Sequence, residues 1–341
     1  MKVLIIKTSS LGDVIHTLPA LSDARQALGN VEFDWVVEEG FADIPRLHPA
    51  VRNVIPIALR RWRKNYWKAW RSGELKAFLK ALRKERYDAV IDAQGLFKSA
   101  LLTRCARGLK IGLNRKSARE GIAAWFYNRT IDAPKIKVAH AVVRMRTLFA
   151  KSLGYAVPQS PINYGLCIGG QSVVAGAYIV FLHGTTWATK HWPNEYWCAL
   201  GQIIQQAGLK VVLSWGNELE KQRAEQIAAV CDAEILPKLK LTLLASVLRQ
   251  ASAVVAVDTG LAHLAAALDV PCLTLYGPTD PKLTGTSGPH AVNLAADFVC
   301  AHCLQRKCTY PKPHAVTPPC YQKLPPQQVW RQLQTIMASH V

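Results

Sequence analysis

A fifteen-residue stretch in the second half of the chain constrains the fold most strongly. Residues 253–257 are apolar, the turn Asp258-Thr259-Gly260 follows, and a second apolar run that contains His263 starts at once. A helix that begins directly after a strand exposes backbone N–H groups and the positive end of its dipole, which suits phosphate binding. Gly260 lets an anion approach the backbone closely. Because a similar glycine turn occupies residues 7–13, the sequence predicts two strand–turn–helix sites.

The alternation of apolar strands and amphipathic helices predicts an α/β protein of two Rossmann-like, doubly wound domains. In the first half we expect strands at Lys2–Lys7, Val31–Glu38, Asn53–Ile57, Ala89–Ala93 and Lys110–Leu113, and helices at Val14–Ala27, Glu74–Glu85, Phe97–Arg107 and His140–Leu153. In the second half we expect strands at Tyr178–His183, Leu209–Trp215, Glu234–Pro237, 253–257 and Cys272–Tyr276, and helices at Asn194–Ala207, Glu218–Val230, Leu241–Ala251 and from Gly260.

The domains are expected at residues 1–160 and 170–341, because Tyr155–Ile168 is poor in regular signals and reads as a linker. Ligands of doubly wound domains bind outside the carboxyl ends of the strands. Both glycine turns lie at such ends. We therefore expect the two domains to face each other across a cleft that holds the ligands.

Length and composition are those of a globular protein: 341 residues, half of them hydrophobic. The sequence contains no uncharged apolar run of 18 residues, and the apolar run at its start is too short for a signal peptide. A cytoplasmic protein is expected. Nine cysteines in that compartment indicate thiols or metal ligands rather than disulfides.

Positive charge is concentrated in the first half. Residues 1–160 contain 29 Lys and Arg against 13 Asp and Glu, a net charge of +16, whereas the remainder has 13 against 10, a net charge of +3. The first half is therefore expected to face a polyanion: nucleic acid, an anionic membrane surface or a phosphorylated substrate.

The densest basic segment is Arg60–Arg71, in which Trp62, Tyr66, Trp67 and Trp70 fall near one face of a predicted helix. Aromatic rings among cations suit a membrane interface, and stacking on nucleic acid would use the same residue types. The alternative is a solvated cationic helix that packs its aromatic rings on the core.

Two charged residues are candidates for chemistry. Lys190 lies in the loop after a predicted strand, with the hydroxyls of Thr185 and Thr186 nearby, and such a cation suits a leaving diphosphate. Asp13 starts a predicted helix, either as a capping carboxylate or as a general base. His16 lies one turn further on. Lys190 could equally be a solvated loop lysine.

Familiar nucleotide-binding patterns are absent from the sequence. There is no G-x-G-x-x-G after a strand, no G-x-x-x-x-G-K-[ST] loop and no Asp-x-Asp pair for a metal-bound diphosphate. Any nucleotide phosphates must then be neutralised by the protein itself.

Four of the cysteines gather late in the chain, at Cys300, Cys303, Cys308 and Cys320. They could form a structural tetrahedral Zn²⁺ site, although only the first pair has familiar spacing. A thiol-rich loop or a disulfide formed in vitro is the alternative.

Four landmarks together resemble the ADP-heptose:lipopolysaccharide heptosyltransferase family, which has the two-Rossmann GT-B architecture. They are residues 7–20 (KTSSLGDVIHTLPA), 190–193 (KHWP), 258–263 (DTGLAH) and 276–281 (YGPTDP). The resemblance covers essentially the whole chain. Residues 33–42 and the basic run 60–64 are most similar to the heptosyltransferase I branch, whereas the cysteine segment departs from it.

The resemblance implies site residues for both substrates. It implies Asp13 as general base and Lys190 as the cation that neutralises the diphosphate. It implies that the donor ADP-L-glycero-β-D-manno-heptose contacts Thr185, Thr186, Lys190, Glu220 (at the ribose), Asp258, Thr259, Gly260 and His263. It implies that the acceptor contacts Ser10, Arg60, Arg61, Arg63, Lys64, Arg119 and His140.

The function predicted from the sequence is inverting transfer of heptose to a Kdo residue of Kdo-lipid A, at the inner face of the membrane. No metal or other cofactor is expected in the chemistry and no nucleic acid as partner. Two alternatives remain open at this point: heptosyltransferase II, which uses a heptose acceptor, and a non-enzymatic protein that binds polyanions or membranes. The non-enzymatic alternative is disfavoured, because a protein that only binds polyanions would not need Asp13 or Lys190.

Overall fold

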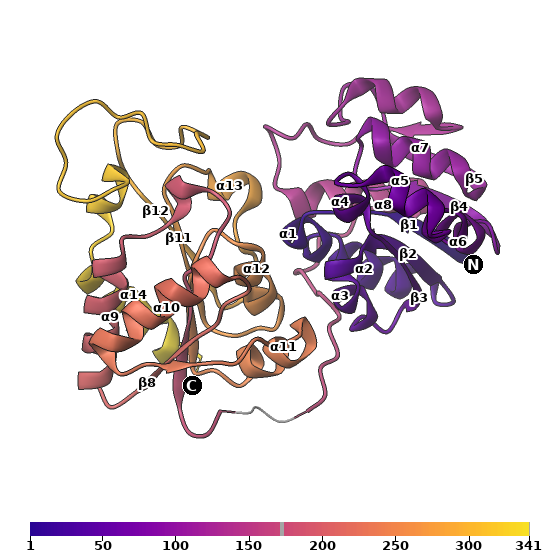
Figure 1. Cartoon of the computed structure of the whole chain (residues 1–341). Coiled ribbons are helices and arrows are strands. Elements are labelled where there is room, and N and C mark those ends of the chain that lie inside the picture. Colours follow the sequence, from indigo (N-terminus) through magenta and orange to yellow (C-terminus); the bar gives the residue numbers. More distant parts are fainter. Residues whose placement is uncertain (171–173, 341) are drawn as a thin grey trace. The chain divides into compact units, whose positions relative to one another are not determined.

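The computed structural model describes residues 1–170 and 174–340, apart from the side chain of Tyr66. The chain divides into two compact units, Met1–Cys167 and Ile168–Val341 (Figure 1). The segment 155–167, expected as linker, belongs to the first unit. Each unit is described by itself.

Unit 1 is built on a parallel sheet of six strands in the order β3-β2-β1-β4-β5-β6. The strands are β1 (Lys2–Ile6), β2 (Glu32–Glu38), β3 (Val51–Ile57), β4 (Arg86–Asp92), β5 (Arg107–Leu113) and β6 (Arg129–Ile131). Val3, Leu4, Ile5 and Ile6 of β1 are completely buried, since a central parallel strand is covered on both faces.

Helices cover both faces of this sheet. They are α1 (Leu11–Ile15), α2 (Leu18–Leu28), α3 (Asp43–Arg46), α4 (Leu59–Trp62), α5 (Tyr66–Arg71), α6 (Glu74–Leu82), α7 (Phe97–Cys105) and α8 (Ala141–Leu153), with 3₁₀ turns η1 (Glu39–Phe41) and η2 (Gly121–Phe126). Phe33 of β2 contacts Phe149 of α8, whereas Val36 packs in the cluster that contains Phe78 of α6. Residues 33 and 36 point to opposite faces of a strand, so α8 and α6 lie on opposite sides of the sheet.

The basic segment 60–71 differs from the prediction of one helix with a shared aromatic face. It forms two short helices, because Asn65 starts α5 anew by accepting a hydrogen bond from Lys68 N (3.0 Å). Trp62 is buried in the core and donates its Nε1–H to Glu74 (2.7 Å), whereas Trp67 and Trp70 are exposed. The side chain of Tyr66 lies outside the described residues. Similarly, the helix expected at Val14–Ala27 is divided into α1 and α2, with Pro19 at the start of α2.

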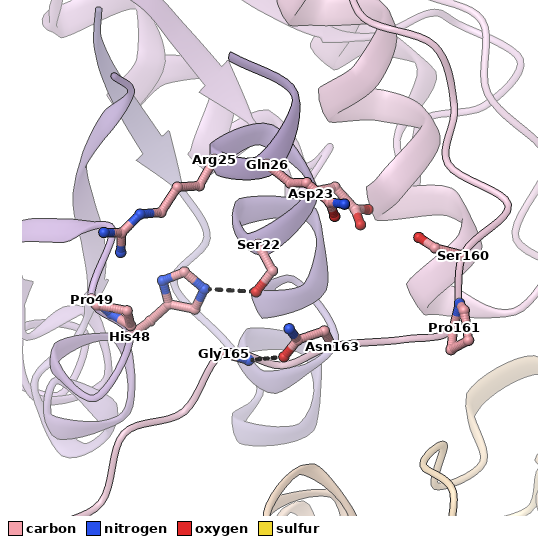
Figure 2. A pocket seen from close by; sticks show the side chains of 10 residues that line it. All are labelled: Ser22, Asp23, Arg25, Gln26, His48, Pro49, Ser160, Pro161, Asn163 and Gly165. Atoms are coloured by element: carbon pink, nitrogen blue, oxygen red, sulfur yellow. Dashed lines mark hydrogen bonds between the residues drawn. The ribbon is translucent and has the colours of Figure 1, made fainter. Parts of the chain in front are cut away.

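The last segment of unit 1 packs along α2 and borders a cavity of about 600 Å³, shown in Figure 2. His48 Nδ1 accepts Ala50 N, which leaves Nε2 to donate to Ser22 Oγ (3.0 Å). Burial lowers the pKa of His48 to about 4, so the ring is neutral at pH 7. Gly165 has a φ of +63°, and a Cβ there would lie 2.5 Å from His48 Nε2. A glycine is therefore required for this segment to lie against the histidine.

Unit 2 repeats the architecture with a parallel sheet of order β12-β11-β10-β7-β8-β9. Its strands are β7 (Tyr178–Leu182), β8 (Lys210–Leu213), β9 (Glu234–Ile235), β10 (Ala253–Val257), β11 (Cys272–Tyr276) and β12 (Ala291–Ala295). Its helices are α9 (Asn194–Gln206), α10 (Glu218–Cys231), α11 (Leu241–Arg249), α12 (Gly260–Ala267), α13 (Pro281–Thr284) and α14 (Pro326–Ala338), with 3₁₀ turns η3 (Ala188–Lys190) and η4 (Pro319–Lys323).

One face of this second sheet packs on α9, α10 and α14, through a cluster that includes Phe181, Trp197 and Leu333. Tyr178, which points to the other face, donates its hydroxyl to Val247 O of α11 (2.7 Å). No helix among the described residues combines the length and apolar character needed to cross a bilayer.

The prediction missed the edge strands β6 and β12 and the helix α14, besides the short helices α3 and α13 and the 3₁₀ turns. The edge strands β6 and β12 are short or half-exposed, and β12 contains Asn293, whose side chain accepts a hydrogen bond from Thr286 (2.6 Å). Neither has the continuous apolar run of an internal strand. The helix α14 follows the cysteine segment, and its apolar residues Val329, Leu333 and Ile336 pack on the same cluster as α9.

Candidate active site

Asp13 lies at the carboxyl edge of the unit 1 sheet, in the helix that follows β1. Its Oδ2 accepts hydrogen bonds from the backbone N–H and the hydroxyl of Ser10, both 2.9 Å long. Its Oδ1 faces Lys7 Nζ at 3.7 Å. The N-cap of α1 is Ser10 rather than Asp13, and Asp13 caps the Ser10 N–H from the third position of the helix, with a cation also beside it. Ser10, predicted for the acceptor, is engaged in holding Asp13.

The electrostatics of this pair keep Asp13 ionised. Burial alone would raise the pKa of the Asp13 carboxyl, but the Lys7 ammonium, the Ser10 N–H and Arg119 outweigh it and hold that pKa well below its ordinary value. Lys7 is itself buried and donates to Ala93 O (3.1 Å). The side chain of Asp13 retains 31% exposure against 7% for Lys7, so the anion is the accessible partner.

Gln94, which the sequence analysis missed, holds the turn that carries Asp13. Its Oε1 accepts Thr8 N (3.0 Å) and Ser9 N (3.3 Å), and its Nε2 donates to Ser9 O (2.8 Å). The backbone N–H of Gln94 is bound in turn by Asp92 Oδ1 (2.8 Å). Asp92 and Gln94 are polar residues at the end of a buried strand, and this pattern was the signal available in the sequence. Strands β1 and β4 are neighbours that end at the same edge, so residues after β4 lie beside the turn that carries Asp13.

Cationic and histidine side chains surround Asp13. His16 and His140 meet edge to face with ring centroids 5.4 Å apart. Arg119 and Arg144 lie close enough to lower the pKa of Lys7, after burial itself. Arg144 is mostly buried and donates to Pro134 O (2.9 Å) and Ser117 O (3.1 Å). The structure therefore gathers Arg119 and His140, two of the predicted acceptor residues, near the proposed base.

The other predicted acceptor residues lie in or after α4, beyond the end of β3. Arg60 stacks over Phe41 at 4.9 Å, and its N–H donates to Glu38 Oε1 (3.1 Å). Arg61 is already paired with Glu39 (3.1 Å) and Glu74 (2.8 Å), which favours a structural role for this residue. Arg63 and Lys64 are exposed in the turn between α4 and α5.

In unit 2 the corresponding edge also carries a lysine–aspartate ion pair, but here the lysine is the more exposed partner. Lys190 Nζ lies 2.6 Å from Asp258 Oδ2, and Thr279 donates its hydroxyl to the same oxygen (2.6 Å). Thr185 donates to the backbone carbonyl of Asp258 (3.1 Å). The structure thus unites three predicted donor residues, Thr185, Lys190 and Asp258. Thr279 belongs to the 276–281 motif, but the sequence did not predict it as a site residue.

The loop that carries Lys190 is fixed from several sides. Tyr321 donates its hydroxyl to Lys190 O (2.9 Å), and Thr189 donates to Gln305 O (2.6 Å). The Lys190 ammonium stands 4.6 Å from the centroid of the Trp187 ring. With the side chain 15% exposed, the ammonium is positioned rather than freely solvated, which argues against a simple loop lysine.

The α12 N-terminus provides the second feature of this edge. Thr259 and Gly260 begin the helix and are half-buried, and His263 is buried one turn further on. Thr186 is exposed beside Thr185. The free N–H groups of a helix start favour a phosphate, as predicted from the sequence.

Glu220 lies near the start of α10, after β8. Its Oε2 accepts Gly216 N (2.8 Å). A Cβ at Gly184 would stand 2.6 Å from Glu220 Cδ, so the glycine lets this carboxylate approach the loop of Thr185. The predicted ribose ligand therefore belongs to the same edge as Lys190.

The cysteine segment is a loop with free thiols. Cys300, Cys303 and Cys308 are exposed and Cys320 is buried. Burial, together with the neighbouring Cys300, Cys303 and Cys308, raises the pKa of the Cys320 thiol to about 12. Within residues 1–170 and 174–340 no three His, Cys, Asp or Glu side chains are grouped to hold a metal ion. This arrangement gives the zinc prediction no support.

Two doubly wound parallel sheets, each with a lysine–aspartate pair at its carboxyl edge, have the architecture of the GT-B glycosyltransferases, as solved heptosyltransferase structures do. The sequence model of glycosyltransferase family 9 (heptosyltransferase) matches residues 75–314. The chain belongs to this family, as the sequence motifs predicted.

Similar proteins include lipopolysaccharide heptosyltransferase 1 of Pseudomonas aeruginosa, 50% identical in an alignment that covers 99% of this chain and 98% of that protein. The protein of the same name from Escherichia coli K12 is 53% identical, over 84% of this chain and 91% of the relative. Among solved structures, E. coli heptosyltransferase WaaC with ADP matches with a TM-score of 0.86 and 46% identity, covering 98% of this chain and all of the other.

Proposed function

We propose that this chain is an inverting glycosyltransferase that moves L-glycero-D-manno-heptose from ADP-heptose to a Kdo residue of Kdo-lipid A, in the synthesis of the lipopolysaccharide inner core. The observation that carries the proposal is the charged pair in each unit: an accessible anion, Asp13, and an accessible cation, Lys190. The full-length similarity to heptosyltransferase 1 supports the choice of sugar.

The reaction needs one proton acceptor and one stabilised leaving group. Asp13 takes the proton of the acceptor hydroxyl, and the freed oxygen forms a bond to the anomeric carbon of the heptose. The bond from that carbon to the phosphate oxygen breaks, and its electron pair leaves with ADP. Because the nucleophile attacks opposite the leaving group, the anomeric configuration inverts.

The donor site is proposed at the carboxyl edge of the unit 2 sheet. Lys190 neutralises the diphosphate, and its ammonium then shares its ion pair between Asp258 and the phosphate. The N–H groups that follow Thr259 add donors, and Glu220 binds the ribose. Thr186 and His263 complete this set, and Asp258 contacts the heptose. The solved structures of E. coli WaaC with ADP and with ADP-2-deoxy-2-fluoro heptose support a donor of this type.

The acceptor site is proposed at the carboxyl edge of unit 1. The net charge of +16 over residues 1–160 suits a carboxylated, phosphorylated glycolipid. Arg60, Arg63, Lys64, Arg119 and His140 are the proposed contacts, with Arg61 holding α4 in place. Trp67 and Trp70, 74% and 65% exposed, would meet the headgroup layer on the cytoplasmic side of the membrane.

The test is transfer assayed with purified acceptors. We expect release of ADP and transfer of heptose when lipid A carrying Kdo alone is supplied. Transfer only to an acceptor that already carries heptose would instead identify a heptosyltransferase II. We expect EDTA to leave the rate unchanged, because Lys190 and backbone N–H groups neutralise the diphosphate. A strict Mg²⁺ requirement would overturn this metal-free mechanism.

A further inference from the structure

Unit 1 carries a second group of exposed apolar side chains, away from Trp67 and Trp70 in sequence. Trp125 is 74% exposed, Ile122 46%, and Phe97 and Leu101 42% each. Ile122 and Trp125 belong to η2, and Phe97 and Leu101 belong to α7. We call these four residues the η2 patch. Large apolar side chains grouped in this way indicate a contact surface.

Direct contacts join the two elements of the η2 patch. The rings of Phe97 and Phe126 meet edge to face at 5.5 Å. Glu120 Oε2 accepts Phe97 N (2.7 Å), and Glu120 N donates to Gly95 O (3.0 Å). Residues i and i+3 of a 3₁₀ turn, and i and i+4 of an α-helix, share a face, so each element presents two apolar side chains together.

The patch is not required to build the core of unit 1. The inward face of α7 is occupied by the buried residues Ser99, Ala100 and Thr103. Leu102 and Cys105 pack against the cluster of Trp62 and Phe78. Phe97 and Leu101 are the residues that α7 leaves outside this packing. Phe97 remains 42% exposed although its ring meets Phe126, and Leu101 is exposed to the same degree.

Positive charge is dense in the segment of sequence that contains the patch. Residues 97–126 contain seven Lys and Arg and a single acidic residue, Glu120, whose carboxylate caps the Phe97 N–H. The exposed cations in this range include Lys98, Arg104, Arg115, Lys116 and Arg119. Tryptophan among cations is the composition of a surface that rests on anionic lipid, with rings at headgroup depth and charges at the phosphates.

We propose that the η2 patch docks unit 1 on an anionic lipid bilayer. The inference rests on the proposed function, in which the acceptor is itself held in a membrane by its acyl chains. The loop that leads into η2 carries Arg119, which acts electrostatically on Asp13. Insertion of Trp125 and Ile122 would therefore hold Arg119, one of the proposed acceptor contacts, near the lipid surface that carries the acceptor.

The experiment measures flotation of the full chain with phosphatidylcholine vesicles, with and without phosphatidylglycerol. The variant is Ile122→Ser/Trp125→Ser, and the matched control is Val230→Ser, an exposed apolar residue on α10 of unit 2. We expect the wild type and the control to bind anionic vesicles, less strongly as salt rises. We expect the double variant to bind at least about tenfold more weakly, from the lost apolar burial.

Heptose transfer distinguishes this inference from the proposed function. With a deacylated acceptor in solution, the double variant should match the wild type, which also reports that it is folded. With the intact acceptor in vesicles, its rate should fall. Unchanged vesicle binding by the double variant would overturn the inference. So would a wild-type dimer that the double variant cannot form, because the patch would then bind a second copy. Failure of the wild type on the deacylated acceptor would refute the proposed function instead.

Discussion

The two units carry similar lysine–aspartate pairs, but the more exposed partner is the anion in unit 1 and the cation in unit 2. Each holds a lysine and an aspartate together at the carboxyl edge of a parallel sheet, with the nitrogen and oxygen 3.7 Å apart in unit 1 and 2.6 Å in unit 2. In unit 1 the lysine is the buried partner and Asp13 the more exposed one, at 7% against 31%. In unit 2 Lys190 is more exposed than Asp258, at 15% against 9%.

This difference matches the needs of the two substrates. An acceptor hydroxyl needs an anion to take its proton, and a departing diphosphate needs a cation. In unit 1 burial would raise the pKa of Asp13, but the buried Lys7 ammonium outweighs it and holds that pKa below its ordinary value. The fold is therefore shared between the units, whereas the order of burial within each pair fits the two roles that we propose for them.

The largest effect is expected from removing the anion of unit 1. Asp13→Ala should lower kcat by about 10²–10⁴, the range for loss of a general base. ADP binding, measured by calorimetry, should remain as in the wild type because Lys190 is untouched. Asp13→Asn, which keeps the size but not the charge, should be nearly as slow. Near-normal turnover in either variant would reduce Asp13 to a helix cap.

Removing the cation of unit 2 should come next. Lys190→Ala should lower kcat by roughly 10²–10³, as when one donor to a developing charge is lost, and should weaken ADP binding. Lys190→Arg should recover part of both. Donor kinetics equal to those of the wild type would exclude Lys190 from the diphosphate site.

A smaller effect is expected from the clamp behind Asp13. Gln94→Leu removes three hydrogen bonds to residues 8 and 9 and should lower kcat about tenfold, because the base loses its fixed position. KM for ADP-heptose should not change, since Gln94 belongs to unit 1. A rise in that KM with unchanged kcat would contradict a positioning role.

The smallest effect concerns pH. Because the pKa of Asp13 is lowered on folding, its contribution to stability is present above the unfolded pKa of about 3.9 and is lost as pH falls toward the folded pKa. The difference in unfolding free energy between the wild type and Asp13→Asn should stay constant from pH 7 to 5 and shrink below about pH 4. A difference that changes between pH 7 and 6 would show that the carboxyl titrates in that range.

The fold and the charged site residues could be predicted from the sequence. The residues that hydrogen-bond to these site residues or to the turns that carry them could not. Internal parallel strands such as 253–257 are continuous apolar runs, and the turns after them marked Asp13 and Asp258. The edge strands β6 and β12 lack that signal. Gln94 acts across strands that are distant in sequence, so only the strand order places it beside Ser9, whereas Thr279 reaches Asp258 from the end of the next strand, β11. Asn65, which divides the basic segment, looked like one more polar residue in a helix.

We propose that Asp13 and Lys190 act on opposite sides of one anomeric carbon. A crystal structure of the chain with ADP-2-deoxy-2-fluoro heptose, the ligand named for one of the similar E. coli structures, tests it directly. The account predicts the diphosphate within hydrogen-bonding distance of Lys190 Nζ, and the Asp13 carboxylate facing the anomeric carbon from the side away from ADP. A carboxylate on the same side as the diphosphate, or one turned away from the sugar, would contradict it.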